Sequence, residues 1–264
     1  MKSSKSQMPN NKQRPNDQSP NRRKSLFWCL VLGSCFLFVI WSLAFGFSDH
    51  AAAQQSDGPQ LTSFPTQDGG LIYAHEHGKG QRGVVLAHGA RFNKESWEKQ
   101  ARALAKEGFR VLAIDFRGYG KSKGPEQKDV FKAPLHYDVL AAVRYLHKAG
   151  AKSVSVLGAS MGAGASADAS IESKEGEIDR LILLAGWGSG PAEKLKGRKL
   201  FAVARDDLGP GDMPRLATIR KHYEKAGEPK ELLVLEGSAH AQALFETDQG
   251  ERLMREIIRF LSAK

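Results

Sequence analysis

The sequence predicts an α/β fold, in which helices cover both faces of a mainly parallel β-sheet. From about residue 84 onward, short runs rich in Val, Ile and Leu alternate with amphipathic stretches at helical spacing. These apolar runs lack the polar alternation of a half-exposed strand, so each expected strand is buried on both faces. Helices packed on both sides of a parallel sheet provide that burial.

The first two expected strands form a hairpin. Residues 61–66 and 71–77 flank Gln67-Asp68-Gly69-Gly70, a turn signal that predicts antiparallel pairing. The later strands are expected at residues 84–87, 110–116, 153–157, 180–185, 199–204 and 231–235. The clearest helical patterns cover residues 96–107, 135–148 and 251–261.

Charge and cysteine content exclude two classes of protein. The net charge is +10, but residues 1–25 hold seven Lys and Arg against one acid, Asp17, so the body is nearly balanced. A nucleic-acid partner is therefore not expected, because such proteins carry a basic surface on the folded domain. Cys29 and Cys35 both precede the body. The body thus has no disulfide framework, Cys nucleophile or Cys-ligated zinc.

Residues 26–47 form an uncharged apolar run. At about 1.5 Å per residue, a helix of this length crosses the ~30 Å hydrocarbon core of a bilayer. The polar and basic residues 1–25 are expected to be a disordered tail, which the positive-inside rule places in the cytoplasm. The sequence therefore predicts an exported body.

Two fates of the apolar run stay open. A retained helix would anchor the body outside the cytoplasm, with residues 48–60 as a linker. Cleavage after Ala53, in the small-residue stretch Ala51-Ala52-Ala53, would release a secreted or periplasmic protein. In both cases the folded domain is expected at residues 61–264.

A G-x-S-x-G motif, Gly158-Ala159-Ser160-Met161-Gly162, follows an expected strand and precedes a run of small residues. Between a strand and a helix, this motif is typical of a nucleophile elbow, a strained turn that projects a serine hydroxyl above the sheet. The flanking glycines let neighbouring elements approach without a Cβ clash. Ser160 is therefore the candidate nucleophile.

A serine nucleophile requires a histidine base and a carboxylate that orients the histidine. His240 follows the last expected strand, and Asp206 and Asp207 follow the strand at residues 199–204. We predict Asp207 as the acid, because a carboxylate just past the strand end can reach His240, with Asp206 as the alternative. The chain order Ser, Asp, His is typical of the G-x-S-x-G fold.

Acyl transfer also requires N–H donors for the developing oxyanion. The backbone N–H of Met161, at the start of the expected helix, is one candidate. The second is expected in His88-Gly89-Ala90-Arg91, directly after the strand at residues 84–87. We predict that Ala90 supplies this donor, with Arg91 as the alternative. His88 is expected to shape the loop.

These motifs, with Trp97 and Asp115-Phe116-Arg117-Gly118-Tyr119-Gly120-Lys121-Ser122, resemble the α/β-hydrolase superfamily over residues 61–264. The sequence is similar to the monoacylglycerol-lipase, dienelactone-hydrolase-like and serine-aminopeptidase-like branches without choosing among them. The resemblance implies an eight-stranded sheet with an antiparallel second strand. It also implies a hydrolase with a Ser-Asp-His triad that needs no metal or other cofactor.

Only residues 186–198 separate the expected strands at 180–185 and 199–204. This segment is too short for the helical cap that lipid-specific members often insert, so we expect a minimal cap and an open pocket. The expected activity is carboxylesterase-like cleavage of a small-molecule ester. Aminopeptidase-like hydrolysis, perhydrolysis, and a non-catalytic binding module displayed at the membrane stay open as alternatives. The membrane is a partner only through residues 26–47, if they are uncleaved.

Overall fold

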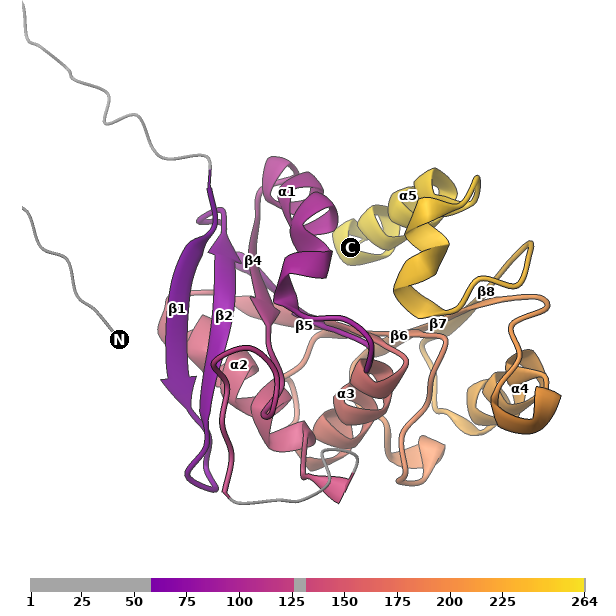
Figure 1. Ribbon diagram of the computed structural model, residues 1–264, viewed down its shortest axis with the longest axis horizontal. Helices are drawn as coiled ribbons and strands as arrows, with labels where there is room; N and C mark the ends of the chain where they lie inside the picture. Colours follow the sequence, from indigo (N-terminus) through magenta and orange to yellow (C-terminus); the bar gives the residue numbers. More distant parts are fainter. Residues whose placement is uncertain (1–57, 126–131, 264) are drawn as a thin grey trace, which may run out of the picture. The chain divides into compact units, whose positions relative to one another are not determined.

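The computed structural model describes residues 58–125 and 132–263 and confirms the α/β architecture (Figure 1). The described strands form an eight-stranded sheet in the order β1-β2-β4-β3-β5-β6-β7-β8. β2 (Leu71–His77) pairs antiparallel with β1 (Gln60–Pro65) and with β4 (Phe109–Ile114). All other neighbouring strands in this sheet pair in parallel. The antiparallel second strand agrees with the superfamily resemblance.

Four of the five remaining strands are buried as their apolar runs predict, and the strand at the sheet edge is not. Nearly every position of the four strands at the centre of the sheet is buried, whereas β8 lies at the edge and is half-buried. Their bounds are β3 (Arg82–Ala87), β5 (Ser153–Ala159), β6 (Arg180–Leu184), β7 (Arg198–Ala204) and β8 (Lys230–Leu235).

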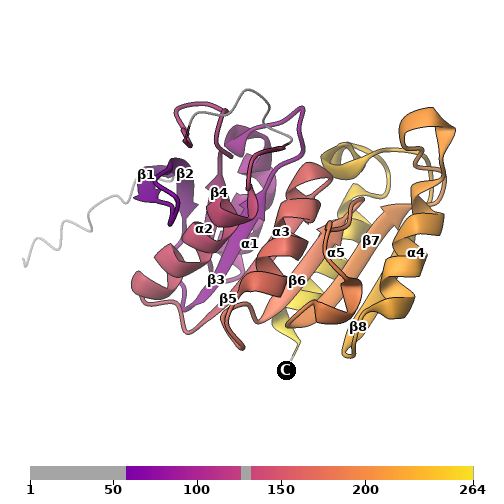
Figure 2. The same cartoon turned by 90° about the horizontal axis from the view of Figure 1, so that it is seen from below.

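Helices cover both faces of the sheet (Figure 2). One face carries α1 (Glu98–Lys106) and α5 (Gly250–Ser262), and the other carries α2 (His136–Lys148), α3 (Met161–Glu172) and α4 (Arg215–Lys225). Short 3-10 helices are η1 (Lys94–Trp97), η3 (Ala192–Lys194), η4 (Pro210–Asp212) and η5 (Ala241–Glu246). Because η3 is the helical element between β6 and β7, the expected minimal cap is confirmed.

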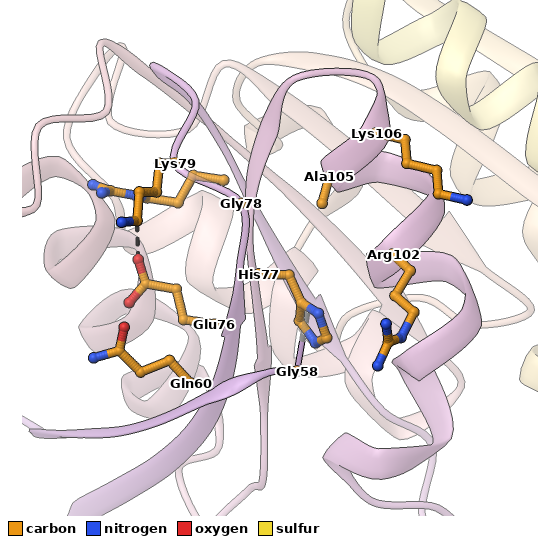
Figure 3. A pocket seen from close by; sticks show the side chains of 10 residues that line it. Gly58, Gln60, Glu76, His77, Gly78, Lys79, Arg102, Ala105 and Lys106 are labelled. Atoms are coloured by element: carbon orange, nitrogen blue, oxygen red, sulfur yellow. Dashed lines mark ion pairs between the residues drawn. The ribbon is translucent and has the colours of Figure 1, made fainter. Parts of the chain in front are cut away.

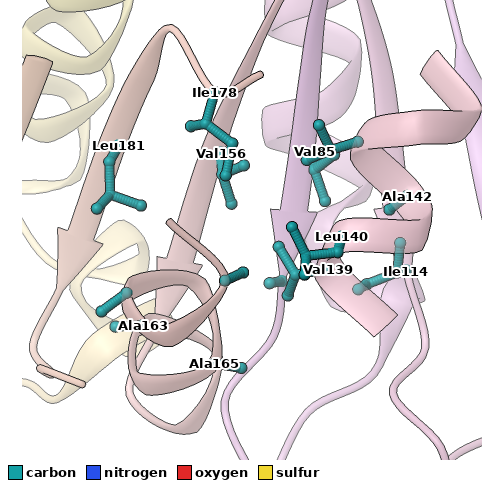
Figure 4. Close-up of a cluster of buried hydrophobic side chains, with 14 of the residues drawn as sticks. Val85, Ile114, Val139, Leu140, Ala142, Val156, Ala163, Ala165, Ile178 and Leu181 are labelled. Carbon is teal, nitrogen blue, oxygen red and sulfur yellow. The ribbon is translucent and has the colours of Figure 1, made fainter. Parts of the chain in front are cut away.

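Two apolar cores form because successive strand residues point to opposite faces. In β3, Val85 joins the core beneath α2 and α3, whereas its neighbours Val84 and Leu86 join the core beneath α1 and α5. Figure 4 shows the first core, where Val156 and Leu181 extend the row that Val85 begins. The two cores fix the sheet between its helices.

Several element boundaries differ from the predicted ones. Gln60 is part of β1 and not of the linker, because its backbone pairs with Glu76. The helix expected at residues 96–107 is divided into η1 and α1, since the Asn93 side chain accepts a hydrogen bond from Ser96 N and starts a separate turn. β4 ends at Ile114, before the predicted residue 116. These shifts leave the order of elements unchanged.

The predictions for the tail at residues 1–25, the apolar run at 26–47 and cleavage after Ala53 concern residues outside the described part of the chain. Within residues 58–125 and 132–263, helices long and apolar enough to cross a bilayer are not found.

A buried arginine ties the β1–β2 hairpin to α2. Arg117 is 3% exposed and lies between two carboxylates. Its Nη1 lies 2.5 Å from Oδ2 of Asp68, and its Nε lies 2.9 Å from Oδ1 of Asp138, which is fully buried. The hydrogen bond from Arg117 lowers the pKa of Asp68 to about 2, whereas burial raises the pKa of Asp138. Asp138 therefore depends on Arg117 for its charge compensation.

We expect Arg117→Met to lower the free energy of unfolding by about 3–5 kcal/mol, because the variant leaves the buried carboxylate of Asp138 without its positively charged partner. Urea denaturation measures this loss. The control is Arg259→Met, which removes a half-exposed arginine paired with Glu231 and Glu256 and should cost less than about 1 kcal/mol. Equal losses in the two variants would contradict the assigned role of Arg117.

Candidate active site

Three predicted site residues lie just beyond the ends of parallel strands. Ser160 directly follows β5, Asp207 follows β7, and His240 follows β8. Because parallel strands run in the same direction, their carboxyl ends meet at one edge of the sheet, where ligands bind in open α/β folds. The fold therefore brings together side chains that lie far apart in the sequence.

The three side chains form a continuous hydrogen-bonded chain. His240 Nε2 lies 2.8 Å from Ser160 Oγ, and His240 Nδ1 lies 2.8 Å from Asp207 Oδ2. The Asp207 carboxylate favours the tautomer with the proton on Nδ1. In that tautomer, the Nε2 lone pair accepts the hydrogen bond of the Ser160 hydroxyl. The site therefore holds a serine next to a correctly oriented base.

The structure distinguishes the two candidate acids by position. Asp207 is 1% exposed and contacts His240 directly. Asp206 is exposed, and its backbone N–H donates to Gly237 O at 2.9 Å. Adjacent residues at the strand end thus point in different directions, with the carboxylate of Asp207 next to the imidazole.

The backbone of Ser160 has the strained conformation expected of a nucleophile elbow. Its φ of 52° and ψ of −112° are rarely adopted by residues with a side chain. Two glycines permit this turn. A Cβ at Gly158 would lie 2.2 Å from Gly162 O, and a Cβ at Gly162 would lie 2.2 Å from Ala87 O. The motif therefore reflects close backbone packing between β5, α3 and the end of β3.

The two predicted oxyanion donors lie on either side of this turn. Met161 begins α3, where the first N–H groups have no partner inside the helix. Ala90 follows Gly89, which lies beside the serine: a Cβ at Gly89 would be in ordinary van der Waals contact with Ser160 Cβ, at 3.4 Å. Tyr119 holds the next peptide along the chain, because its hydroxyl donates to Ala90 O at 2.9 Å.

His88 has the loop-shaping role predicted for it. The side chain is fully buried, and burial lowers its pKa. Its Nδ1 lies 2.9 Å from Gly89 O, and its Nε2 lies 3.2 Å from Phe116 N. A neutral imidazole satisfies both contacts, with Nδ1–H donating to Gly89 O and Nε2 accepting from Phe116 N–H. Both ring nitrogens are therefore occupied by backbone groups.

Sequence reasoning missed two neighbours of the site. Arg215 Nε, at the start of α4, lies 3.3 Å from Asp207 Oδ1. Gln242 lies two residues after His240 and accepts a hydrogen bond from Gly89 N. Arg215 was missed because η4 separates it from Asp207 in the sequence. Gln242 was missed because it is not part of the motifs that identified the other site residues. The only available signal was their proximity in sequence to Asp207 and His240.

A cavity of about 560 Å³ lies apart from these residues (Figure 3). It is bounded by β1, β2 and the last turns of α1, with Glu76, His77, Lys79 and Lys106 among its lining residues. Glu76 is paired with Arg110 at 3.2 Å. The lining does not include Ser160, Asp207 or His240. Clusters of three or more metal-ligating side chains are not found in the described residues.

Comparison with known proteins identifies the fold. A family model described as the alpha/beta hydrolase fold matches residues 83–208. Over these residues the sequence matches the α/β-hydrolase superfamily, and the described sheet and helices have the fold of that superfamily. Among solved structures, the esterase Pf2001 of Pyrococcus furiosus is similar with a TM-score of 0.64 and 19% identity, covering 78% of this chain and 92% of that chain. At this identity the likeness shows the fold alone.

Curated relatives match over shorter segments. Epoxide hydrolase 4 of Mus musculus is 30% identical over 139 residues, covering 45% of this chain and 38% of that protein. The AB hydrolase superfamily protein YisY of Bacillus subtilis is 29% identical over 144 residues, covering 54% of this chain and 51% of that protein. The chain thus spans about half or less of the length of these relatives.

We expect Gly162→Ala to lower the free energy of unfolding by about 1–3 kcal/mol, because the new methyl group would press against the backbone oxygens of Ala87 and His88. Thermal and urea denaturation measure the loss. Gly227→Ala is the matched control, since nothing lies within 4 Å of a Cβ built there. A Gly162→Ala variant as stable as this control would show that the close approach is not required.

Proposed function

We propose that the protein is a serine hydrolase that cleaves a small-molecule carboxylic ester through an acyl-enzyme. The observation that carries this proposal is the chain of two 2.8 Å contacts from Asp207 through His240 to Ser160. A serine hydroxyl is a weak nucleophile until a base accepts its proton, and this arrangement supplies the base and the group that orients it. The strained turn at Ser160 places the hydroxyl at the end of the sheet where the parallel strands terminate.

In the first half of the reaction, Ser160 Oγ attacks the ester carbonyl carbon as His240 Nε2 takes the hydroxyl proton. Asp207 stabilises the imidazolium that forms. The N–H groups of Ala90 and Met161 donate to the oxyanion of the tetrahedral intermediate. Collapse of the intermediate breaks the bond to the alcohol oxygen, which leaves with the proton from His240. The acyl group stays on Ser160.

In the second half, water replaces the alcohol. His240 takes a proton from the water, and the oxygen of the water attacks the acyl carbon. The resulting intermediate expels Ser160 Oγ, which regains its proton from His240, and the carboxylic acid is released. The residues return to their starting state, and this cycle uses no metal or other cofactor.

The substrate and the setting are also proposals. The short β6–β7 connection, with η3 as its helix, supports an open site that admits a compact ester. The apolar run at residues 26–47 supports export of this activity, either anchored to the membrane or released after Ala53. Aminopeptidase-like hydrolysis and perhydrolysis would use the same three residues, Ser160, His240 and Asp207. A panel of aryl esters, aminoacyl anilides and peracid formation separates the three reactions.

We expect a fluorophosphonate probe to label the purified protein, and Ser160→Ala to abolish the labelling. The same variant should lower ester turnover on the order of 10⁶-fold. Gel fluorescence and a chromogenic ester assay measure the two effects. Ser153→Ala, at the start of β5, is the control and should keep both activities. Undiminished labelling of Ser160→Ala would refute a role for this serine.

Substitution of the two adjacent aspartates tests the assignment of the acid. Asp207→Asn should lower kcat by about 10³- to 10⁴-fold, because the amide cannot hold His240 in the required tautomer. Asp206→Asn should stay within about 2-fold of the wild type, since its exposed side chain lies away from His240. Steady-state ester hydrolysis measures both. A larger loss in Asp206→Asn than in Asp207→Asn would reverse the assignment.

A further inference from the structure

Gln242 connects the histidine loop to the loop that carries the predicted oxyanion donor Ala90. Its side chain is 5% exposed. The carbonyl oxygen Oε1 accepts a hydrogen bond from Gly89 N at 2.7 Å, and the amide nitrogen Nε2 donates to Ser96 Oγ at 2.6 Å. Gly89 and Ser96 lie near the two ends of residues 88–96, which we call the oxyanion loop. One side chain thus holds both ends of this loop.

The backbone around Gln242 is arranged for this contact. Ala241, between His240 and Gln242, is 1% exposed and has a φ of 54°. A positive φ is uncommon for a residue with a side chain and is unfavourable, so the surrounding contacts must maintain it. This turn begins η5 and allows His240 to face Ser160 while Gln242 reaches Gly89.

Gly89 is a close neighbour of the candidate nucleophile. A Cβ at Gly89 would lie 3.4 Å from Ser160 Cβ, 3.4 Å from Ala159 O and 3.5 Å from Gln242 Oε1. Ala90 is the next residue, so the direction of its N–H depends on the placement of the Gly89 peptide. Any movement of Gly89 away from Gln242 would therefore displace the N–H of Ala90.

We propose that Gln242 is a positioning residue that fixes the N–H of Ala90 for the transition state. The inference rests on the proposed acyl-transfer function. Gln242 does not contact the reacting atoms and acts through Gly89. Because Gln242 lies two residues after His240, its hydrogen bond to Gly89 also fixes the spacing between the base and the oxyanion donor.

The chemical consequence is confined mainly to the transition state. The oxyanion forms only after Ser160 attacks, so a displaced donor weakens the transition state more than the bound ester. Displacements of about 1 Å near reacting groups can lower rates about 10²-fold. Loss of the Gln242 contacts should therefore reduce kcat and leave KM nearly unchanged.

The test compares Gln242→Met with Gln100→Met. Methionine keeps the approximate size of glutamine and removes its hydrogen bonds. Gln100 is a matched control because it is also buried, at 8% exposure, but lies on α1 and its Oε1 has no partner among the described residues. For each purified full-length variant, kcat and KM for an aryl ester are measured, with active enzyme counted by fluorophosphonate titration.

A second readout uses an arylboronic acid, whose boron binds the serine oxygen as His240 takes the hydroxyl proton, giving a tetrahedral, negatively charged boronate. We expect Gln242→Met to lower kcat by about 10- to 100-fold, to change KM by less than about 2-fold, and to weaken boronate inhibition by a factor similar to the loss in kcat. Gln100→Met should match the wild type in all three quantities. A purely structural defect would lower the fraction of active enzyme without this selective loss.

Unchanged catalysis in a folded variant would count against the positioning role of Gln242. A Gln242→Met variant that folds and keeps the kcat and boronate affinity of the wild type would overturn it. If Gln242→Met does not fold, Gln242→Asn replaces it. The shorter side chain retracts the amide from Gly89 and should lower kcat at least about 5-fold, whereas unchanged kcat in this variant would overturn the inference. A wild type without ester hydrolysis or fluorophosphonate labelling would instead refute the proposed function.

Discussion

The backbone conformation of Ser160 is the constraint on which the candidate site depends. A positive φ at a residue with a side chain is unfavourable, so its surroundings must hold it in place. The N–H of Ser160 donates to Leu184 O, and its carbonyl accepts from Ala163 N and Gly164 N. These bonds attach the turn to β6 on one side and to α3 on the other. The serine hydroxyl consequently projects from a rigid position.

The sheet places the partners of this serine. Asp207 and His240 follow the ends of β7 and β8, and the parallel direction of these strands carries both residues to the edge where β5 ends. His240 contacts a serine 80 residues away in the sequence and an aspartate 33 residues away. The two apolar cores hold this geometry by fixing the strands between helices on both faces. The loops that follow β7 and β8 need only a few residues to bring Asp207 and His240 to the site.

The amount predicted from sequence depends on how far each feature is determined by local pattern. Buried strands are continuous apolar runs, and amphipathic helices have apolar residues at helical spacing, so the sequence predicts the order of the elements. The observed ends of the elements differ from the predicted ones by one or two residues. The G-x-S-x-G motif identifies Ser160 as the candidate nucleophile, and the position of His240 after the last strand identifies it as the candidate base. Asp207 is preferred to Asp206 from its place just past the strand end, but only the structure shows its carboxylate next to His240, because consecutive residues at a strand end point in different directions. Gln242 was missed since its contacts with Gly89 and Ser96 are tertiary.

Trapping of the covalent intermediate identifies the residue that carries the acyl group. The protein is mixed with an aryl ester that acylates faster than it deacylates, quenched in acid during turnover, digested, and examined by mass spectrometry. The proposed function predicts that the acyl mass appears on the peptide that contains Ser160, in an amount equal to the initial burst of released alcohol. A burst with the acyl group on another residue, or full turnover with Ser160 never modified, would contradict it.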